Sequence, residues 1–104
     1  MRRNSAQVAG EWVYGEHSYA LRADGGNVRF TERIADGTVN GTLVKSGEWY
    51  EGELQMNGER YGHIRLMLTT KGVRQQFKDT GEQAWGEDYY TIRKTVRFGF
   101  GLNY

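Results

Sequence analysis

The chain has 104 residues, and its 14 Lys and Arg against 13 Asp and Glu give a formal net charge of +1 at pH 7. This length fits one domain and leaves no room for a second core. The balanced charge excludes a strongly basic nucleic-acid binder and an acidic tail protein. Because the chain contains no cysteine, disulfide scaffolds, Cys-ligated zinc sites and thiol catalysis are excluded together.

The first nine residues follow neither a strand nor a helix pattern. We therefore expect a flexible tail over 1–9 and a single β-barrel domain over 10–104. No apolar run follows Arg2 and Arg3, which argues against a secretory signal. No stretch approaches the roughly 20 apolar residues of a transmembrane helix. From these features we expect a cytoplasmic protein that does not bind membranes.

Glycine-containing turn signals recur at short, even intervals along the rest of the chain. They are Asp24-Gly25-Gly26, Asp36-Gly37, Ser46-Gly47, Asn57-Gly58, Lys71-Gly72 and Thr80-Gly81. Between them lie alternating segments rich in β-branched and aromatic residues. These segments predict strands near 11–15, 17–23, 27–35, 38–45, 48–56, 61–70, 73–79 and 89–98. The pattern predicts an all-β protein, a small up-and-down antiparallel barrel or curled sheet of about eight strands.

Alternation along each predicted strand separates an inner face from an outer face, because successive side chains point to opposite sides of a sheet. The predicted core contains Trp12, Tyr14, Tyr19, Leu21, Val28, Phe30, Ile34, Val39, Leu43, Tyr50, Leu54, Met56, Ile64, Leu66, Leu68, Val73, Phe77, Tyr90, Ile92, Val96 and Phe98.

Three polar residues fall at core positions of this alternation. Glu32 lies between Phe30 and Ile34, and Gln75 and Lys94 occupy equivalent places in later strands. A buried unpaired charge is costly, so such residues are paired, neutralised or solvated by a cavity, unless a bulge or a barrel-mouth position changes the register. The functional interpretation is that these three residues line a pocket and orient the polar end of a ligand.

Gly10-Glu11-Trp12 at the start of the first predicted strand resembles the Gly-x-Trp opening of the calycin barrels, the lipocalins and fatty-acid-binding proteins. In that group the Trp closes the barrel floor and an Arg of the last strand packs across it. The resemblance implies these roles for Trp12 and for Arg93 or Arg97. It also implies a barrel that holds a small apolar ligand.

We predict non-enzymatic binding of a small apolar or aromatic ligand inside the barrel, without a cofactor or a metal. The predicted ligand-binding residues are Glu32, Gln75, Lys94, Tyr14 and Trp12. The alternative is a protein-interaction or self-assembly module that uses an exposed sheet face and the C-terminal strand.

Other chemistry finds weaker support in the sequence. His17 and His63 have no companion at metal-ligand spacing. As a catalytic base, His63 needs Glu51 or Glu53 on the adjoining strand, and no serine lies in a nucleophile motif. An enzyme is therefore the third interpretation.

Nucleic-acid binding is not expected either. Trp49, Tyr61 and Arg65 share a predicted sheet face suited to base stacking. Four glutamates crowd the same region and repel phosphate, and they are Glu48, Glu51, Glu53 and Glu59.

The C-terminal segment 98–104 alternates apolar residues with glycines and one asparagine. An apolar edge without a charge or a proline is a template for pairing with another chain. The segment therefore predicts a homodimer.

Overall fold

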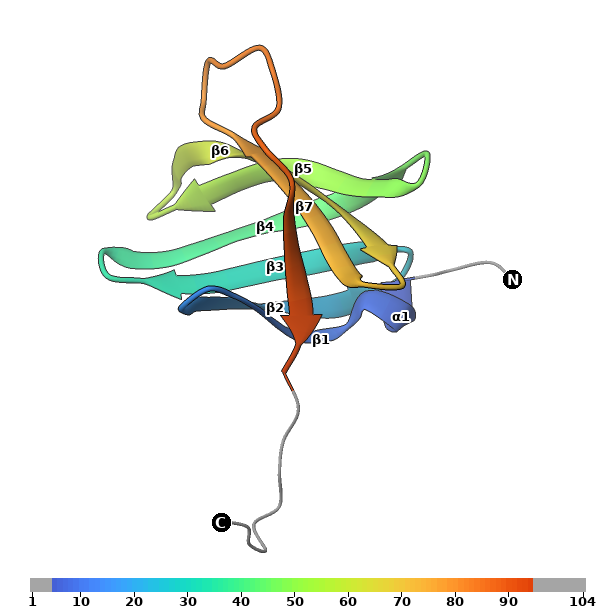
Figure 1. The fold of residues 1–104 in the computed structure, drawn as a ribbon. Helices are drawn as coiled ribbons and strands as arrows, with labels where there is room; N and C mark the ends of the chain where they lie inside the picture. The colour runs from blue at the N-terminus through green and yellow to red at the C-terminus, as the bar shows by residue number, and fades with distance from the viewer. Residues whose placement is uncertain (1–4, 95–104) are drawn as a thin grey trace, which may run out of the picture.

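The computed structural model describes residues 5–94, which form a closed antiparallel barrel whose strands follow one another in chain order (Figure 1). The elements of this part of the chain are α1 (Ser5–Val8), β1 (Gly10–Tyr14), β2 (His17–Asp24), β3 (Asn27–Ile34), β4 (Gly37–Ser46), β5 (Trp49–Met56), β6 (Glu59–Thr69), β7 (Gly72–Lys78) and β8 (Tyr89–Arg93). The prediction of an all-β up-and-down barrel is confirmed. No helix of the described chain is long and apolar enough to cross a membrane.

Two-residue turns join each pair of consecutive strands from β1 to β7. In the Asn57-Gly58 turn the φ angles are 55° and 80°. Positive φ at both positions is what a type I′ turn requires, and its twist matches that of the strands it joins. The connection from β7 to β8 is the long one, and it covers 79–88.

Two glycines allow β4 and β5 to approach each other closely inside the barrel. A Cβ atom at Gly41 would lie 2.4 Å from the carbonyl oxygen of Glu53, and one at Gly52 would lie 2.4 Å from that of Thr42. Glycines at such places let strands coil tightly, as a barrel of small diameter demands.

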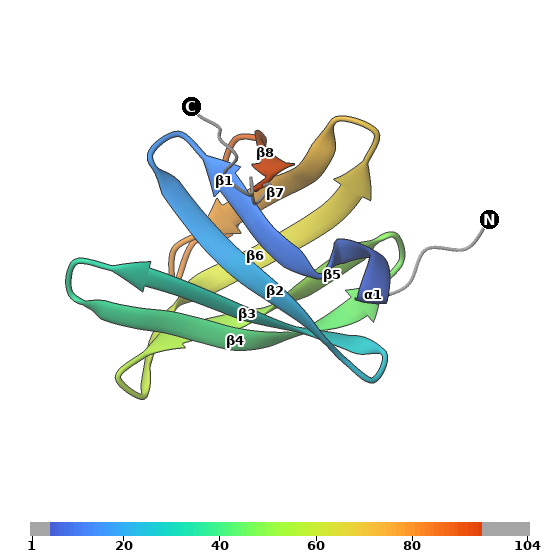
Figure 2. The same ribbon diagram turned by 90° about the horizontal axis from the view of Figure 1, so that it is seen from below.

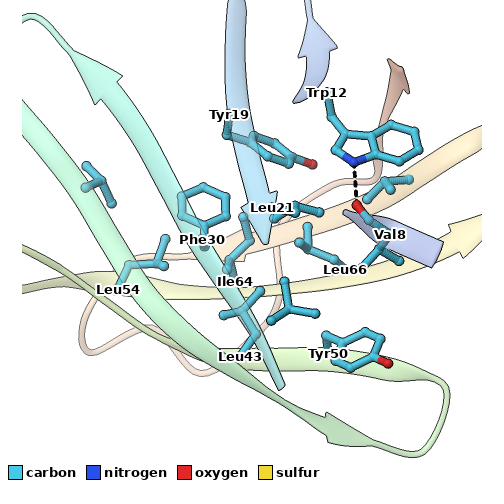
Figure 3. Close-up of a cluster of buried hydrophobic side chains, with 13 residues drawn as sticks. Val8, Trp12, Tyr19, Leu21, Phe30, Leu43, Tyr50, Leu54, Ile64 and Leu66 are labelled. Carbon is cyan, nitrogen blue, oxygen red and sulfur yellow. Dashed lines mark hydrogen bonds between the residues drawn. The ribbon is translucent and has the colours of Figure 1, made fainter. Parts of the chain in front are cut away.

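The inner faces of the strands fill the barrel with apolar side chains (Figure 3). The buried members of this cluster are Val8, Trp12, Tyr19, Leu21, Val28, Phe30, Val39, Leu43, Tyr50, Leu54, Ile64, Leu66 and Val73. Partly buried residues pack against it, namely Tyr14, Ile34, Met56, Leu68 and Phe77. Apart from Val8, all of these residues belong to the predicted core.

The predicted inner face of the last strand is wrong. Tyr90 and Ile92 are 46% and 64% exposed, whereas Thr91 is fully buried. Thr91 pairs with Val73 of β7 and donates its hydroxyl to the Val73 carbonyl at 3.2 Å. This pairing turns the odd-numbered residues of β8 inward. The predicted core residues Val96 and Phe98 lie outside the described part of the chain.

Arg93 of β8 covers the Trp12 ring from the first strand. Its guanidinium carbon lies 4.4 Å from the ring centroid, and its two terminal nitrogens donate to the carbonyls of Ala9 (2.6 Å) and Gln7 (3.1 Å). A Cβ atom at Gly10 would lie 2.6 Å from Arg93 Nη1. A glycine two residues before the tryptophan therefore leaves room for the arginine, and Arg93 makes the contact expected of Arg93 or Arg97.

The α1 turn closes this end of the barrel. The indole nitrogen of Trp12 donates to the Val8 carbonyl at 2.8 Å (Figure 3). The Ser5 hydroxyl donates to the Gly25 carbonyl at 2.7 Å. Val8 is buried in the core. Residues Ser5–Val8 were expected to belong to a flexible tail, because one helical turn is too short to produce a periodic sequence pattern.

Substitution of Trp12 by alanine is expected to lower the free energy of unfolding by about 3–5 kcal/mol, as truncation of a large buried ring does. Urea denaturation measures this loss. The matched control is Trp49→Ala, which removes an indole that lies partly exposed on the outer face and is expected to cost less. A loss below about 1 kcal/mol for Trp12→Ala contradicts the role of Trp12 as the closing residue.

Candidate functional site

The end of the barrel opposite α1 is open and holds a pocket of about 260 Å³. Figure 2 shows this end at the turns that join β1 to β2, β3 to β4 and β5 to β6, away from α1. The pocket is lined by Tyr14, Phe30, Glu32, Leu54, Tyr61, Ile64, Gln75, Phe77 and Tyr89. We call these residues the mouth pocket. Its volume is below the ~300 Å³ at which pockets for drug-sized ligands begin, so it suits a smaller molecule.

Glu32 is the charged residue of the mouth pocket. It lies on the inner face of β3, and its Oε2 accepts a hydrogen bond from the Tyr14 hydroxyl at 2.7 Å. Burial, followed by this hydrogen bond to Glu32, raises the pKa of the Tyr14 phenol above its ordinary value. Tyr14 therefore stays a hydrogen-bond donor at neutral pH and holds the carboxylate in place.

Gln75 on β7 supplies a second polar group to the mouth pocket. The residue is 6% exposed, and its Oε1 is buried without a hydrogen-bond partner in the described chain. A buried acceptor without a partner costs about 1–3 kcal/mol, so buried polar groups are almost always paired. The described chain supplies no hydrogen-bond partner for Gln75 Oε1.

Aromatic rings form most of the remaining wall. Tyr14 lies 5.7 Å from Tyr19 between ring centroids, and Tyr19 lies 4.8 Å from Phe30, so these rings lead from the mouth toward the core. On the other side Tyr61 lies 6.0 Å from Phe77. The pocket therefore combines aromatic walls with polar acceptors.

Tyr61 was not among the predicted site residues, because the alternation along its strand places it on the outer face of the sheet. The pairing of β5 with β6 shifts register between Leu54 and Gln55, where Leu54 pairs with Gly62 and Gln55 with Arg60. The shift leaves Tyr61 as the extra residue, and a bulge of this kind redirects a side chain. The sequence signal was Gly62 inside a strand, which often marks a bulge. Tyr89 was missed for a different reason, since the inner face of β8 was misassigned.

The structure brings together three of the five predicted ligand-binding residues, Tyr14, Glu32 and Gln75. Trp12 lies at the closed end of the barrel beneath Arg93. Lys94 lies outside, where its side chain is 55% exposed and its Nζ is 3.7 Å from Glu11 Oε1. The prediction that Lys94 lines the pocket is therefore corrected. The reason is the misassigned inner face of β8, which also placed Tyr90 and Ile92 in the core.

Two further hollows lie on the outer face of the sheet formed by β1, β2 and β3. One has a volume of about 360 Å³ and the other about 270 Å³. The larger is lined mainly by polar residues, among them Glu11, Glu16 and Arg33, and the smaller contains Arg22 and Arg29. The smaller hollow contains no unpartnered buried polar atom of the described chain. In the larger one, the Tyr19 side chain is buried in the core, where its hydroxyl lies beside Thr91. The mouth pocket is therefore the stronger candidate, although it is not the largest hollow.

A cluster of cationic and aromatic side chains covers the outer face of β5, β6 and β7. Arg65 lies between Trp49 and Trp85, at 4.3 Å and 4.6 Å from the two ring centroids. Arg65 also donates to Gln76 Oε1, and Gln76 donates to Asp88. These contacts hold the β7–β8 connection against the sheet. Arg65 and the rings of Trp49 and Trp85 are therefore already occupied by contacts within the chain. Tyr61, predicted to share this face, lies in the mouth pocket instead.

The histidines form no metal site. His17 stacks on Tyr14 at 5.3 Å, and His63 pairs with Glu53 across the strands. The Glu53 carboxylate lies 3.0 Å from Arg60. Within residues 5–94, no group of three or more His, Cys, Asp or Glu is placed to hold a metal ion.

Comparison of the chain with models of protein families, with curated proteins and with solved structures found no match. The mouth pocket must therefore be interpreted from its own geometry and chemistry.

Substitution of Gln75 by leucine is expected to raise the free energy of unfolding by about 1–2 kcal/mol, because it replaces a buried unpaired acceptor by an apolar group of similar shape. Urea denaturation gives the difference. The matched control is Gln76→Leu on the same strand, which removes bonds to Arg65 and Asp88 and is expected to destabilise the barrel. If both substitutions destabilise the barrel equally, Gln75 has a structural partner and the assignment of its Oε1 to a ligand is wrong.

Proposed function

We propose that the protein binds a small apolar or aromatic molecule in the mouth pocket, with one end of the molecule pointing into the barrel. We further propose that the protein catalyses no reaction on this molecule. The observation that carries this proposal is a pocket walled by aromatic rings that also contains the Glu32 carboxylate and the Gln75 amide. Natural ligand sites combine largely apolar walls with a few placed polar groups. A polar residue that lines an aromatic pocket can orient a ligand there.

The filled interior limits how deeply such a ligand can enter. Phe30, Leu54 and Ile64 are buried and line the pocket, and apolar side chains occupy the barrel below them. A ligand with one aromatic ring or a compact apolar group therefore fits better than a long acyl chain. This favours a smaller ligand than the calycin resemblance alone implies, while the Trp12–Arg93 contact and the eight-strand barrel support that resemblance.

Benzyl alcohol is a suitable neutral probe, because it offers one ring and one hydroxyl donor. Titration of the full-length, isotope-labelled protein is expected to shift the backbone amide signals of Tyr14, Gln75 and Phe77 in a saturable manner. Two-dimensional amide correlation spectra measure this response. Shifts confined to the outer face around Trp49 and Trp85, or no saturable shift at millimolar probe, contradict the proposal.

A pair of variants locates the binding. Phe77→Trp adds bulk to a partly buried position of the mouth pocket and is expected to abolish the saturable shifts. Val44→Trp adds similar bulk at a 48% exposed position on the outside and is expected to leave them unchanged.

The interaction module is the alternative function. Tyr90 and Ile92 are exposed on the outer face of β8, and this apolar pair favours a protein contact there. The homodimer interpretation depends on 98–104, which lie outside the described residues, and it stays a prediction.

A further inference from the structure

We infer that the polar end of the ligand is a small organic cation, an ammonium group, held between the aromatic rings and the acceptors of the mouth pocket. This inference rests on the proposed function and names the chemical class of the ligand for the same pocket.

The first support is the sign of the charge at the mouth. Among the described residues that line the pocket, Glu32 carries a charge, and Lys, Arg and His are absent. The Tyr14 hydroxyl occupies one oxygen of the Glu32 carboxylate. No ion pair within residues 5–94 neutralises Glu32. The Glu32 carboxylate therefore places a negative charge in the pocket, and no cationic side chain of the described residues neutralises it.

The second support is the pattern of cation–π contacts over the whole barrel. Cationic side chains lie over every described Trp and Tyr ring outside the mouth pocket except the buried Tyr19: Arg93 over Trp12, Arg65 and Arg74 over Trp49, Arg65 and Lys78 over Trp85, Lys45 over Tyr50, and Lys71 over Tyr90. The rings of the mouth pocket differ. In the described chain no lysine or arginine covers Tyr14, Phe30, Tyr61, Phe77 or Tyr89.

Aromatic faces and a carboxylate attract the same kind of group. Ring faces carry negative electrostatic potential, and rings arranged around a site recognise ammonium groups. Glu32 supplies the opposite charge, and the Gln75 amide lines the same pocket. An anionic ligand meets repulsion from the same groups. A small ammonium compound with a hydroxyl or a single ring fits both the volume and the chemistry.

The test uses three molecules of nearly equal shape and different charge. They are choline, the neutral 3,3-dimethylbutan-1-ol and the anionic 3,3-dimethylbutanoate. Amide shift titrations of the full-length protein are expected to give an affinity for choline about ten-fold higher than for the alcohol. The butanoate is expected to bind most weakly.

Glu32→Gln identifies the source of the charge preference. This variant is expected to remove most of the difference between the affinities for choline and for the alcohol. Glu48→Gln is the matched control, because it removes one negative charge from the exposed turn between β4 and β5 at the other end of the barrel. If Glu32→Gln does not fold, Tyr89→Leu removes a 54% exposed ring from the rim and is expected to weaken choline more than the alcohol.

The outcomes separate this inference from the proposed function. Equal affinities for choline and the alcohol overturn the cation assignment and leave the pocket a site for neutral ligands. Binding of benzyl alcohol without binding of choline does the same. A preference for choline that survives Glu32→Gln overturns the role of Glu32. If neither benzyl alcohol nor any of the three molecules binds at the mouth, both the inference and the proposed function fail.

Discussion

The barrel depends on one short seam between its first and last strands. β1 and β8 pair through two residue pairs, Trp12 with Arg93 and Val13 with Ile92, and the Lys94 amide adds a bond of 2.8 Å to the Glu11 carbonyl. Closing the sheet removes its exposed edges, which otherwise favour aggregation. The seam also fixes which residues of β8 face inward. Trp12 and Arg93 share the inner face, so Thr91 is buried and Tyr89 reaches the mouth.

The chemical difference between the two ends of the barrel follows from this arrangement. At one end, hydrogen bonds and a ring contact join α1, Trp12 and Arg93. At the other end lie the Glu32 carboxylate, which accepts the Tyr14 hydroxyl, and the Gln75 oxygen, for which the described chain supplies no partner. The polar groups without a complete set of partners therefore gather at the open end, where we propose that a ligand binds.

The sequence allowed the strand pattern and most of the core to be predicted, because turns and alternation are local features. Asn57-Gly58 determines its own turn, and residues such as Phe30 and Leu66 alternate with exposed neighbours. Glu32 and Gln75 were recognised because they interrupt an apolar face. The inner face of β8 was not predictable in this way. Its exposed face carries Tyr90 and Ile92, so hydrophobicity pointed to the wrong side, and only pairing with Val73 and Trp12 determines the correct one.

Two parts of the site depend on tertiary geometry that local patterns do not encode. Tyr61 enters the mouth because a register shift in the pairing of β5 with β6 adds one residue. The distribution of cations over the rings depends on how the strands and the β7–β8 connection pack, as Arg65 between Trp49 and Trp85 illustrates. The sequence identified candidate polar groups of the pocket, and the structure identified its walls.

We infer that an ammonium group binds among the rings of the open end and not on the outer face of the barrel. Intermolecular nuclear Overhauser effects from the methyl protons of bound choline test this claim most directly. We expect contacts to the ring protons of Tyr14, Tyr61 and Phe77. Contacts to the rings of Trp49 and Trp85 instead, where Arg65 already lies, would contradict the account.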